Sequence, residues 1–269
     1  MSSRSGARQR SGERAIVHGV RRLASSATIL GSAAVLAAAA CTSTGARVSP
    51  ASSNSSEATA SAATGPVASG STTGPLRYVA LGDSYTIGTS VGEAERWPNQ
   101  LVARLPALTL VANLGVNGYT SADVTQDELP DLDSLRPEFL TLLIGVNDVV
   151  QGVPSERYRA NVELILDDLV RRVGAGRVLV VTTPDYTVTP AGADYGDPAQ
   201  QAAGIRANNA IESAAAASRG VRVVDIYQIS LGAAGDRGLV AGDGLHPSGR
   251  QYGLWVDAIL PVAQELLAR

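Results

Sequence analysis

The pattern of apolar and polar positions divides the chain into three parts. Residues 1–22 are polar and rich in arginine, and Leu23–Ala40 is an uncharged, alanine-rich run. Residues 42–74 are almost entirely Ser, Thr, Ala, Gly and Pro, without apolar periodicity. Such a segment cannot bury enough apolar surface to offset the entropy lost on ordering, so we expect a flexible linker over residues 41–75. Residues 76–269 alternate between short apolar runs and helical patterns, which predicts one folded domain.

Five apolar runs in this domain have the length and continuity of buried parallel strands. They are Tyr78–Leu81, Leu108–Ala112, Phe139–Ile144, Arg177–Val181 and Val221–Ile226. Helical patterns occur around Trp97–Leu105 and at Ser155–Arg172, Pro198–Arg219 and Gly249–Leu267. Ser155 is the predicted N-cap of its helix, and Gly174 is expected to end it. Alternation of strands and helices predicts an α/β fold whose parallel sheet is covered on both faces.

Residues 1–40 have the order of a signal peptide: basic residues, an apolar run and then small residues. The apolar run is also nearly long enough for an uncleaved membrane anchor. Cys41 follows three alanines and resembles the cysteine of a bacterial lipobox, although Ala38 stands where leucine is usual. Arg21-Arg22 weakly resembles a twin-arginine export signal. We expect lipidation at Cys41 and an extracytoplasmic, membrane-held or secreted protein; the alternative for Cys41 is a chance free thiol.

Charge and composition exclude several kinds of partner. The chain has 22 arginines and no lysine; from Cys41 onwards 16 arginines stand against 24 acidic residues, a net charge of −8 with histidine neutral. A nucleic-acid partner needs basic surface and is not expected. One cysteine and two histidines, His18 and His246, cannot form the common zinc motifs, and no phosphate- or dinucleotide-binding glycine motif occurs. We therefore expect no metal and no cofactor, and the sequence does not indicate an oligomeric state.

Small and polar residues follow the first three strands and precede the last helix. These segments are Gly82-Asp83-Ser84, Asn113-Leu114-Gly115-Val116-Asn117-Gly118, Gly145-Val146-Asn147-Asp148 and Asp243-Gly244-Leu245-His246-Pro247. The carboxyl ends of parallel strands meet at one edge of a sheet, where α/β proteins bind ligands. Together the segments contain a nucleophile, a base, a carboxylate that orients the base, and oxyanion donors, which are the parts that acyl transfer needs.

The residues themselves support these roles but also allow simpler ones. Serine is a weak nucleophile near neutral pH without a base, and His246 is the only histidine in residues 76–269. Asp243 is spaced to hold one imidazole nitrogen and leave the other for Ser84. Taken singly, Ser84 is also explained as a helix N-cap, His246 as a loop histidine satisfied by its neighbours, and Asp243 as a solvated turn residue.

The four segments, in this order, resemble the SGNH (GDSL-like) hydrolase family over essentially all of residues 76–269. The resemblance implies a three-layer α/β/α sandwich with a flavodoxin-like, five-stranded parallel sheet. It implies a catalytic triad and an oxyanion hole: Ser84 as nucleophile, His246 as base and Asp243 as its orienter, with the Ser84 and Gly115 N–H groups and the Asn147 amide as donors. The rival α/β-hydrolase elbow, GxSxG, is disfavoured because Thr86 replaces its last glycine.

Other positions carry weaker predictions. Gly115 and Asn147 are also explained as a left-handed turn glycine and a cap or turn residue. The aperiodic segment 185–200 is read equally as a substrate-facing flap or a disordered insertion. Candidates for the pocket wall are Tyr85 and Tyr119, whereas Trp97 is expected in the core. The acidic cluster Asp123, Asp127, Glu128, Asp131 and Asp133 is expected to be a solvated helix and turn, with a calcium site as the alternative.

The sequence thus predicts a serine esterase that hydrolyses carboxylic ester or thioester bonds of small or lipid acyl substrates through an acyl-enzyme. The alternative within this class is a carbohydrate O-acetyl esterase, which the low aromatic content of 4% mildly disfavours because sugars stack on aromatic rings. The alternative from another class is a non-catalytic surface lipoprotein that keeps the fold as a binding module, because fold does not guarantee function. The complete set of site residues argues against a binding module.

Overall fold

The computed structural model describes residues 74–269. The predicted signal peptide or anchor, Cys41 and nearly all of the linker lie outside the described residues. The strands are β1 (Leu76–Gly82), β2 (Leu108–Asn113), β3 (Phe139–Leu143), β4 (Val178–Val181) and β5 (Arg222–Val224). They form one parallel sheet in the order β2-β1-β3-β4-β5. This is the flavodoxin-like order, so the predicted fold and its five-stranded sheet are confirmed.

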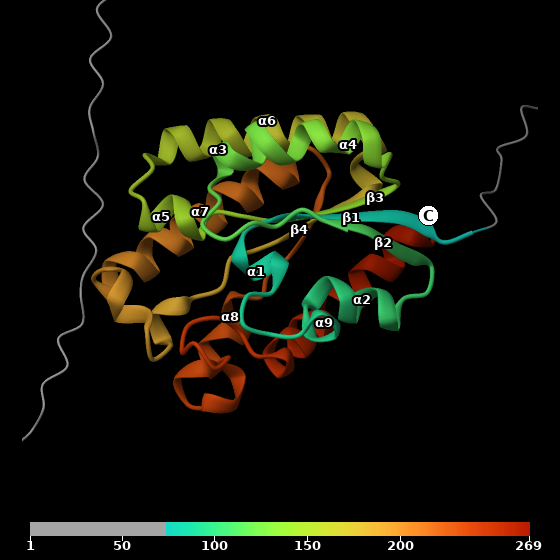
Figure 1. The fold of residues 1–269 in the computed structure, drawn as a ribbon. Coiled ribbons are helices and arrows are strands. Elements are labelled where there is room, and N and C mark those ends of the chain that lie inside the picture. Colours follow the sequence, from blue (N-terminus) through green and yellow to red (C-terminus); the bar gives the residue numbers. More distant parts are fainter. Residues whose placement is uncertain (1–73) are drawn as a thin grey trace, which may run out of the picture. The chain divides into compact units, whose positions relative to one another are not determined.

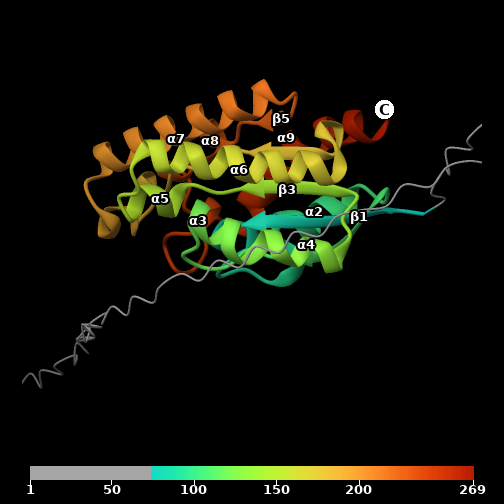
Figure 2. The same ribbon diagram turned by 90° about the horizontal axis from the view of Figure 1, so that it is seen from above.

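Helices cover both faces of the sheet (Figures 1 and 2). One face carries α4 (Leu129–Leu135), α6 (Ser155–Val173) and α7 (Pro198–Ser218), and the other carries α2 (Trp97–Arg104), α8 (Tyr227–Ser230) and α9 (Gly249–Leu267). Short helices α1 (Ser84–Ile87), α3 (Ser121–Asp123) and α5 (Val146–Val150) lie in the connections near the carboxyl edge of the sheet. Within residues 74–269, none of the helices is both long and apolar enough to cross a bilayer.

The third strand shows why the strands are continuously apolar. Phe139 and Leu143 belong to the buried cluster on the α2 and α9 side, and Leu140 and Leu142 belong to the cluster on the α6 side. All four are fully buried, because successive side chains of a strand point to opposite faces and both faces are covered. Trp97 is also fully buried in the first of these clusters, so its predicted place in the core is confirmed.

The ends of α6 test the predicted caps. Ser155 is the first helical residue, and the N-cap position belongs to Pro154, so the predicted Ser155 cap is wrong. The carbonyl of Pro154 accepts the N–H groups of Arg157 and Tyr158, which satisfies two N–H groups of the first turn without a side chain. Gly174 ends the helix with a φ of 79°, which favours glycine, so this predicted stop is confirmed.

Candidate active site

The first functional segment lies where the strand order reverses, between β1 and β3, which is the ligand position of this type of sheet. Ser84 is the first residue of α1, and the side chain of Asp83 caps this helix by accepting the Tyr85 N–H at 2.9 Å. The alternative explanation of Ser84 as an N-cap is therefore wrong. Within residues 74–269 the Ser84 hydroxyl does not cap the helix and is available for another role.

Two glycines allow the segments to pack closely here. At Gly82, which has a φ of 146°, an added Cβ would collide with the carbonyl oxygen of Leu143. At Gly115 an added Cβ would lie 2.7 Å from the Asp83 carbonyl oxygen and 2.7 Å from the Ile87 nitrogen. Gly115 is not among the glycines with positive φ, so its explanation as a left-handed turn residue is wrong. Glycine is required at 115 because the loop after β2 touches the backbone of α1.

Asp243 and His246 form the pair that their spacing predicts. The Nδ1 atom of His246 lies 2.6 Å from Oδ2 of Asp243, and Oδ1 of Asp243 accepts the N–H groups of Leu245 and His246. Partial burial raises the pKa of the Asp243 carboxyl, but hydrogen bonds from Leu245, Ser90 and His246 outweigh it and hold the pKa well below its ordinary value. An ionised carboxylate only accepts hydrogen bonds, so Nδ1 is the donor in this pair, and in the neutral ring Nε2 is the nitrogen with the lone pair.

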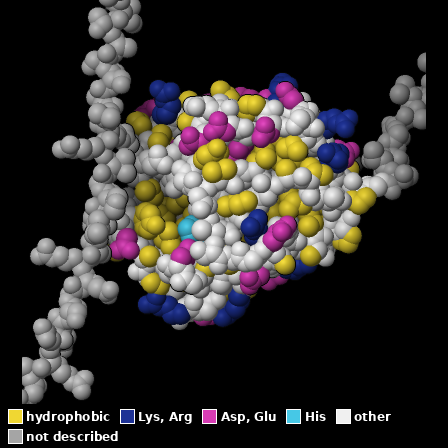
Figure 3. Space-filling view, viewed as in Figure 1, with side chains coloured by type: hydrophobic (Ala, Val, Ile, Leu, Met, Phe, Trp, Pro, Cys, Tyr) yellow, Lys and Arg dark blue, Asp and Glu magenta, His cyan; other side chains and the backbone are white. Residues whose placement is uncertain are grey.

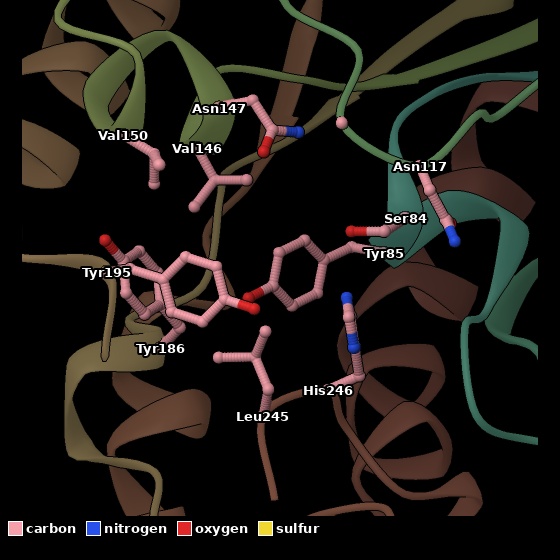
Figure 4. Close-up of a pocket in the computed structure, with 11 residues that line it drawn as sticks. Ser84, Tyr85, Asn117, Val146, Asn147, Val150, Tyr186, Tyr195, Leu245 and His246 are labelled. Carbon is pink, nitrogen blue, oxygen red and sulfur yellow. The ribbon is translucent and has the colours of Figure 1, made fainter. Parts of the chain in front are cut away.

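Ser84 and His246 line the same cavity, of about 240 Å³. Figure 4 shows a ring nitrogen of His246 directed toward the Ser84 hydroxyl. Among the described residues no hydrogen bond joins the two side chains; in a site without substrate, catalytic hydrogen bonds are commonly long and tighten when substrate binds. The ring of Tyr85 packs against the imidazole, with centroids 5.3 Å apart, so its predicted place in the pocket wall is confirmed.

The rest of the cavity is largely apolar. Its further lining residues are Asn117, Gly118, Val146, Asn147, Val150, Tyr186, Tyr195 and Leu245. Figure 3 shows apolar atoms gathered in a hollow beside His246, and Figure 4 places Tyr186 and Tyr195 on the side of the cavity opposite Ser84. Tyr119, the other predicted wall residue, is not among the lining residues.

The segment 185–200 supplies these two tyrosines. Tyr186 lies in a 3-10 turn at Tyr186–Val188 and Tyr195 ends another at Gly192–Tyr195, and their rings meet edge to face at 5.8 Å. The buried carboxylate of Asp185 anchors the start of the segment by accepting the Tyr227 hydroxyl at 2.7 Å. The N–H of Ala191 donates to the carbonyl of Gly244, in the loop that carries His246. The reading as a disordered insertion is wrong, since the segment forms a wall of the cavity.

The three predicted oxyanion donors differ in whether they already have a hydrogen-bond partner. The N–H of Ser84 has no hydrogen-bond partner within residues 74–269, as expected for the first N–H of a helix. The amide of Asn147 donates to the carbonyl of Tyr119 at 2.9 Å, and it makes no cap, because Gly145 is the N-cap of α5. The N–H of Gly115 donates to Oδ1 of Asn113 at 3.1 Å, and Gly115 does not line the cavity. The oxyanion roles of Ser84, Gly115 and Asn147 therefore all stay predictions.

Three residues near the site were missed by sequence reasoning. The Ser90 hydroxyl donates to Oδ2 of Asp243 at 2.7 Å, and Asn113 accepts the Gly115 N–H. Glu128 is only 2% exposed and accepts the Gly82 N–H at 3.0 Å. The contacts of Ser90 and Glu128 join segments that only the fold brings together, so the sequence carries no signal for them. The Asn113 contact is local, two residues along the chain, and lies within a segment that the sequence had singled out.

The acidic cluster differs from its expected form. Glu128 is buried, so the prediction of a wholly solvated cluster is wrong. Burial raises the pKa of Glu128 to about 9 and that of nearby Asp83 to about 8. Across residues 74–269, no group of histidine, cysteine and acidic side chains is arranged to hold a metal ion.

Comparisons with known proteins bear on the family and the fold. Residues 80–254 match the GDSL-like lipase/acylhydrolase family. No curated protein matches the chain. Among solved structures, LAE5, an alpha/beta hydrolase enzyme from the metagenome of Lake Arreo, Spain, is 20% identical, with 72% of this chain and 97% of that chain covered and a TM-score of 0.56.

Two further solved structures share the fold at similar distance. TesA is 20% identical, with 71% of this chain and 99% of that chain covered and a TM-score of 0.57. Axe2, an acetylxylan esterase from Geobacillus stearothermophilus, is 18% identical, with 71% and 95% covered and a TM-score of 0.56. At these identities the likeness shows the fold alone.

Proposed function

Because the chain belongs to the GDSL-like lipase/acylhydrolase (SGNH) family of serine hydrolases, we propose that it hydrolyses esters of small to medium-sized apolar acyl groups through an acyl-enzyme at Ser84. The observation that carries this proposal is the cavity. Ser84 and His246 lie on one side of it (Figure 4), and Val146, Val150 and Leu245 contribute apolar wall. A hydrophobic space next to a nucleophile and its base favours an acyl chain over a polar group.

The proposed reaction starts with attack of Ser84 Oγ on the ester carbonyl carbon, while His246 Nε2 takes the hydroxyl proton. The oxyanion that forms would be held by the Ser84 N–H and by the Asn147 amide once substrate displaces part of its present bonding. His246 returns the proton to the leaving alcohol as the carbon–oxygen bond breaks. Water then repeats the sequence on the acyl-enzyme and releases the acid and the free serine.

The cavity volume supports a limit on the acyl group. The cavity volume of about 240 Å³ lies below the usual range of ligand pockets, about 300–1,000 Å³, which favours a small to medium-sized acyl group over a long one. Thioesters fit the same proposal, because their carbonyl reacts by the same steps. Long lipid chains would have to extend past Tyr195, which is 44% exposed at the rim.

Hydrolysis of p-nitrophenyl esters from acetyl to palmitoyl tests the proposal. We expect kcat/KM to rise with acyl length to a maximum at a medium length and then fall, and Ser84→Ala to abolish turnover. Hydrolysis of the acetyl ester alone, with release of acetate from acetylated xylan, would favour the carbohydrate esterase alternative, for which the named activity of Axe2 is the one pointer. Correctly folded protein without activity on any ester would favour the binding module.

We also propose that the domain is held outside the cytoplasm by a lipid on Cys41. The support is the order of the first 41 residues and the long Ser, Thr, Ala, Gly and Pro linker that follows. Membrane fractionation of the full chain and of Cys41→Ala tests it. The wild-type chain should sediment with membranes and the variant should not. Continued retention of the variant would indicate an uncleaved anchor.

A further inference from the structure

We propose that Ser90 is a positioning residue that fixes Asp243, and through it His246, relative to the nucleophile. The inference rests on the proposed serine esterase function and adds a fourth residue to its catalytic arrangement. Ser90 follows the nucleophile by six positions and lies in the connection after α1, whereas Asp243 is 153 residues away along the chain.

The hydrogen bond reaches the atom that matters for the base. Oδ2 of Asp243 accepts both the Ser90 hydroxyl at 2.7 Å and His246 Nδ1 at 2.6 Å, while Oδ1 accepts two backbone N–H groups. With these four donors around it, the carboxylate has one orientation. Without Ser90, Oδ2 would be held by His246 alone, so rotation of the imidazole would no longer be opposed from the side of the nucleophile.

The backbone of Ser90 gives a second, independent observation. Its φ is 67°, in the left-handed region that favours glycine, and within residues 74–269 Arg136 is the one other non-glycine residue with positive φ. Arg136 is the residue that closes α4, a usual place for this conformation. Ser90 closes no helix, because Gly88 already ends α1 with a φ of 72°. Strain of this kind collects at functional positions, and here the serine carries the one group that glycine would lack.

The hydrogen bond from Ser90 to Asp243 links the segment that follows the nucleophile to the segment that carries the base. Ser84 begins α1, and Gly88 and Ser90 lie in the connection directly after it, where the Gly88 and Thr89 N–H groups both donate to the Ser84 carbonyl. A shift of the connection therefore moves the nucleophile and the support of Asp243 together. In the proposed role, the Ser90 bond couples the segment that carries Ser84 to the segment that carries His246. Ser90 itself does not line the cavity, so it does not contact the acyl group.

Three substitutions separate the hydroxyl from the backbone. Ser90→Gly removes the hydroxyl and relaxes the backbone, Ser90→Ala removes the hydroxyl and keeps the strain, and Ser90→Asn tolerates the left-handed conformation and supplies an N–H donor. We expect Gly and Ala variants to lose roughly tenfold in kcat with KM within about twofold, since misplacing a catalytic group by an ångström costs up to about a hundredfold. Ser90→Asn should recover part of the loss. Ser134→Ala, which removes an exposed hydroxyl bonded to a helix carbonyl, is the control and should keep wild-type kcat.

Thermal denaturation and histidine NMR complete the test. Ser90→Gly should be at least as stable as wild type, so its loss of kcat cannot come from unfolding. The proton on His246 Nδ1 should change its chemical shift in Ser90→Gly and not in Ser134→Ala, and the two histidines of the chain keep this spectrum simple. Wild-type kcat in Ser90→Gly, or an unchanged Nδ1 proton, would overturn the inference. An inactive wild-type enzyme would overturn the proposed function instead, and the NMR result would still decide the role of Ser90.

Discussion

Replacing Glu128 by glutamine should flatten the dependence of stability on pH. Glu128 ends a π-helical turn at Val124–Glu128, and its Oε2 accepts the Gly82 N–H beneath the nucleophile. Its other oxygen is buried without a hydrogen-bond partner within the described part of the chain. Burial raises the pKa of this carboxyl to about 9, although the Gly82 N–H acts in the opposite direction.

The direction in which stability changes with pH depends on whether the folded or the unfolded state holds the Glu128 proton. Between about pH 4.5 and pH 9 the folded protein keeps a proton on Glu128 that the unfolded chain has lost. The folded state therefore loses stability as the pH rises through this window, with a limiting slope of about 1.4 kcal/mol per pH unit and a limiting total of about 6 kcal/mol. A domain is stable by only about 5–15 kcal/mol, and relaxation of the site reduces the penalty. We expect the free energy of unfolding of the wild-type protein to fall by about 2–3 kcal/mol across this pH window because of Glu128.

Urea denaturation at a series of pH values from about 5 to 9 measures this directly. Glutamine keeps the carbonyl oxygen that accepts the Gly82 N–H, so Glu128→Gln should match wild type near pH 5 and exceed its free energy of unfolding near pH 9. Glu138→Gln is the matched control, because Glu138 accepts the Arg77 N–H of the same strand at the same 3.0 Å but is not buried. Equal slopes for wild type and Glu128→Gln would refute the reasoning.

Three further predictions concern the site. Tyr195→Ala should raise kcat/KM for esters longer than the wild-type optimum, by about three- to fourfold per added methylene that gains burial, while Tyr195→Phe keeps the wild-type length profile; identical profiles for all three would remove Tyr195 from the pocket wall. Asp243→Asn should lower kcat by about a thousandfold or more without unfolding the protein, because His246 loses the acceptor that fixes its tautomer; near-normal kcat would contradict this. Gly115→Ala should destabilise the domain by about 1–3 kcal/mol in urea denaturation, because the added Cβ meets the Asp83 carbonyl; unchanged stability would contradict the close approach.

The layers of the fold could be predicted from local patterns. Short continuous apolar runs such as Phe139–Ile144 favour strands covered on both sides, and the sheet confirms this prediction for β3. Helix N-caps were harder to predict. Serine is a more typical cap residue than proline, but in α6 the carbonyl of Pro154 accepts N–H groups of the first turn, and Ser155 is already helical. Whether Pro154 or Ser155 takes the N-cap position depends on the conformation of one backbone turn, and the hydrophobic periodicity of the sequence carries no information about that conformation.

The site was predictable as far as its chemistry is carried by residue type and order. The pair Asp243 and His246 is local in sequence, and the structure brings it together at 2.6 Å. Ser90, Glu128 and Tyr195 were not predictable, because serine, glutamate and tyrosine are common on surfaces. Their roles depend on contacts across the fold, and the sheet order that creates those contacts is not encoded in any single segment.

Labelling with a serine-directed fluorophosphonate tests the central claim most directly. The reagent reacts with a serine whose hydroxyl is activated by a neighbouring base. Mass spectrometry of the labelled full chain should find one adduct, on Ser84, and none in Ser84→Ala; His246→Ala should slow its formation by at least about a thousandfold. Folded wild-type protein that takes no label, or that takes it on another serine, would contradict the claim that Ser84 is activated by His246.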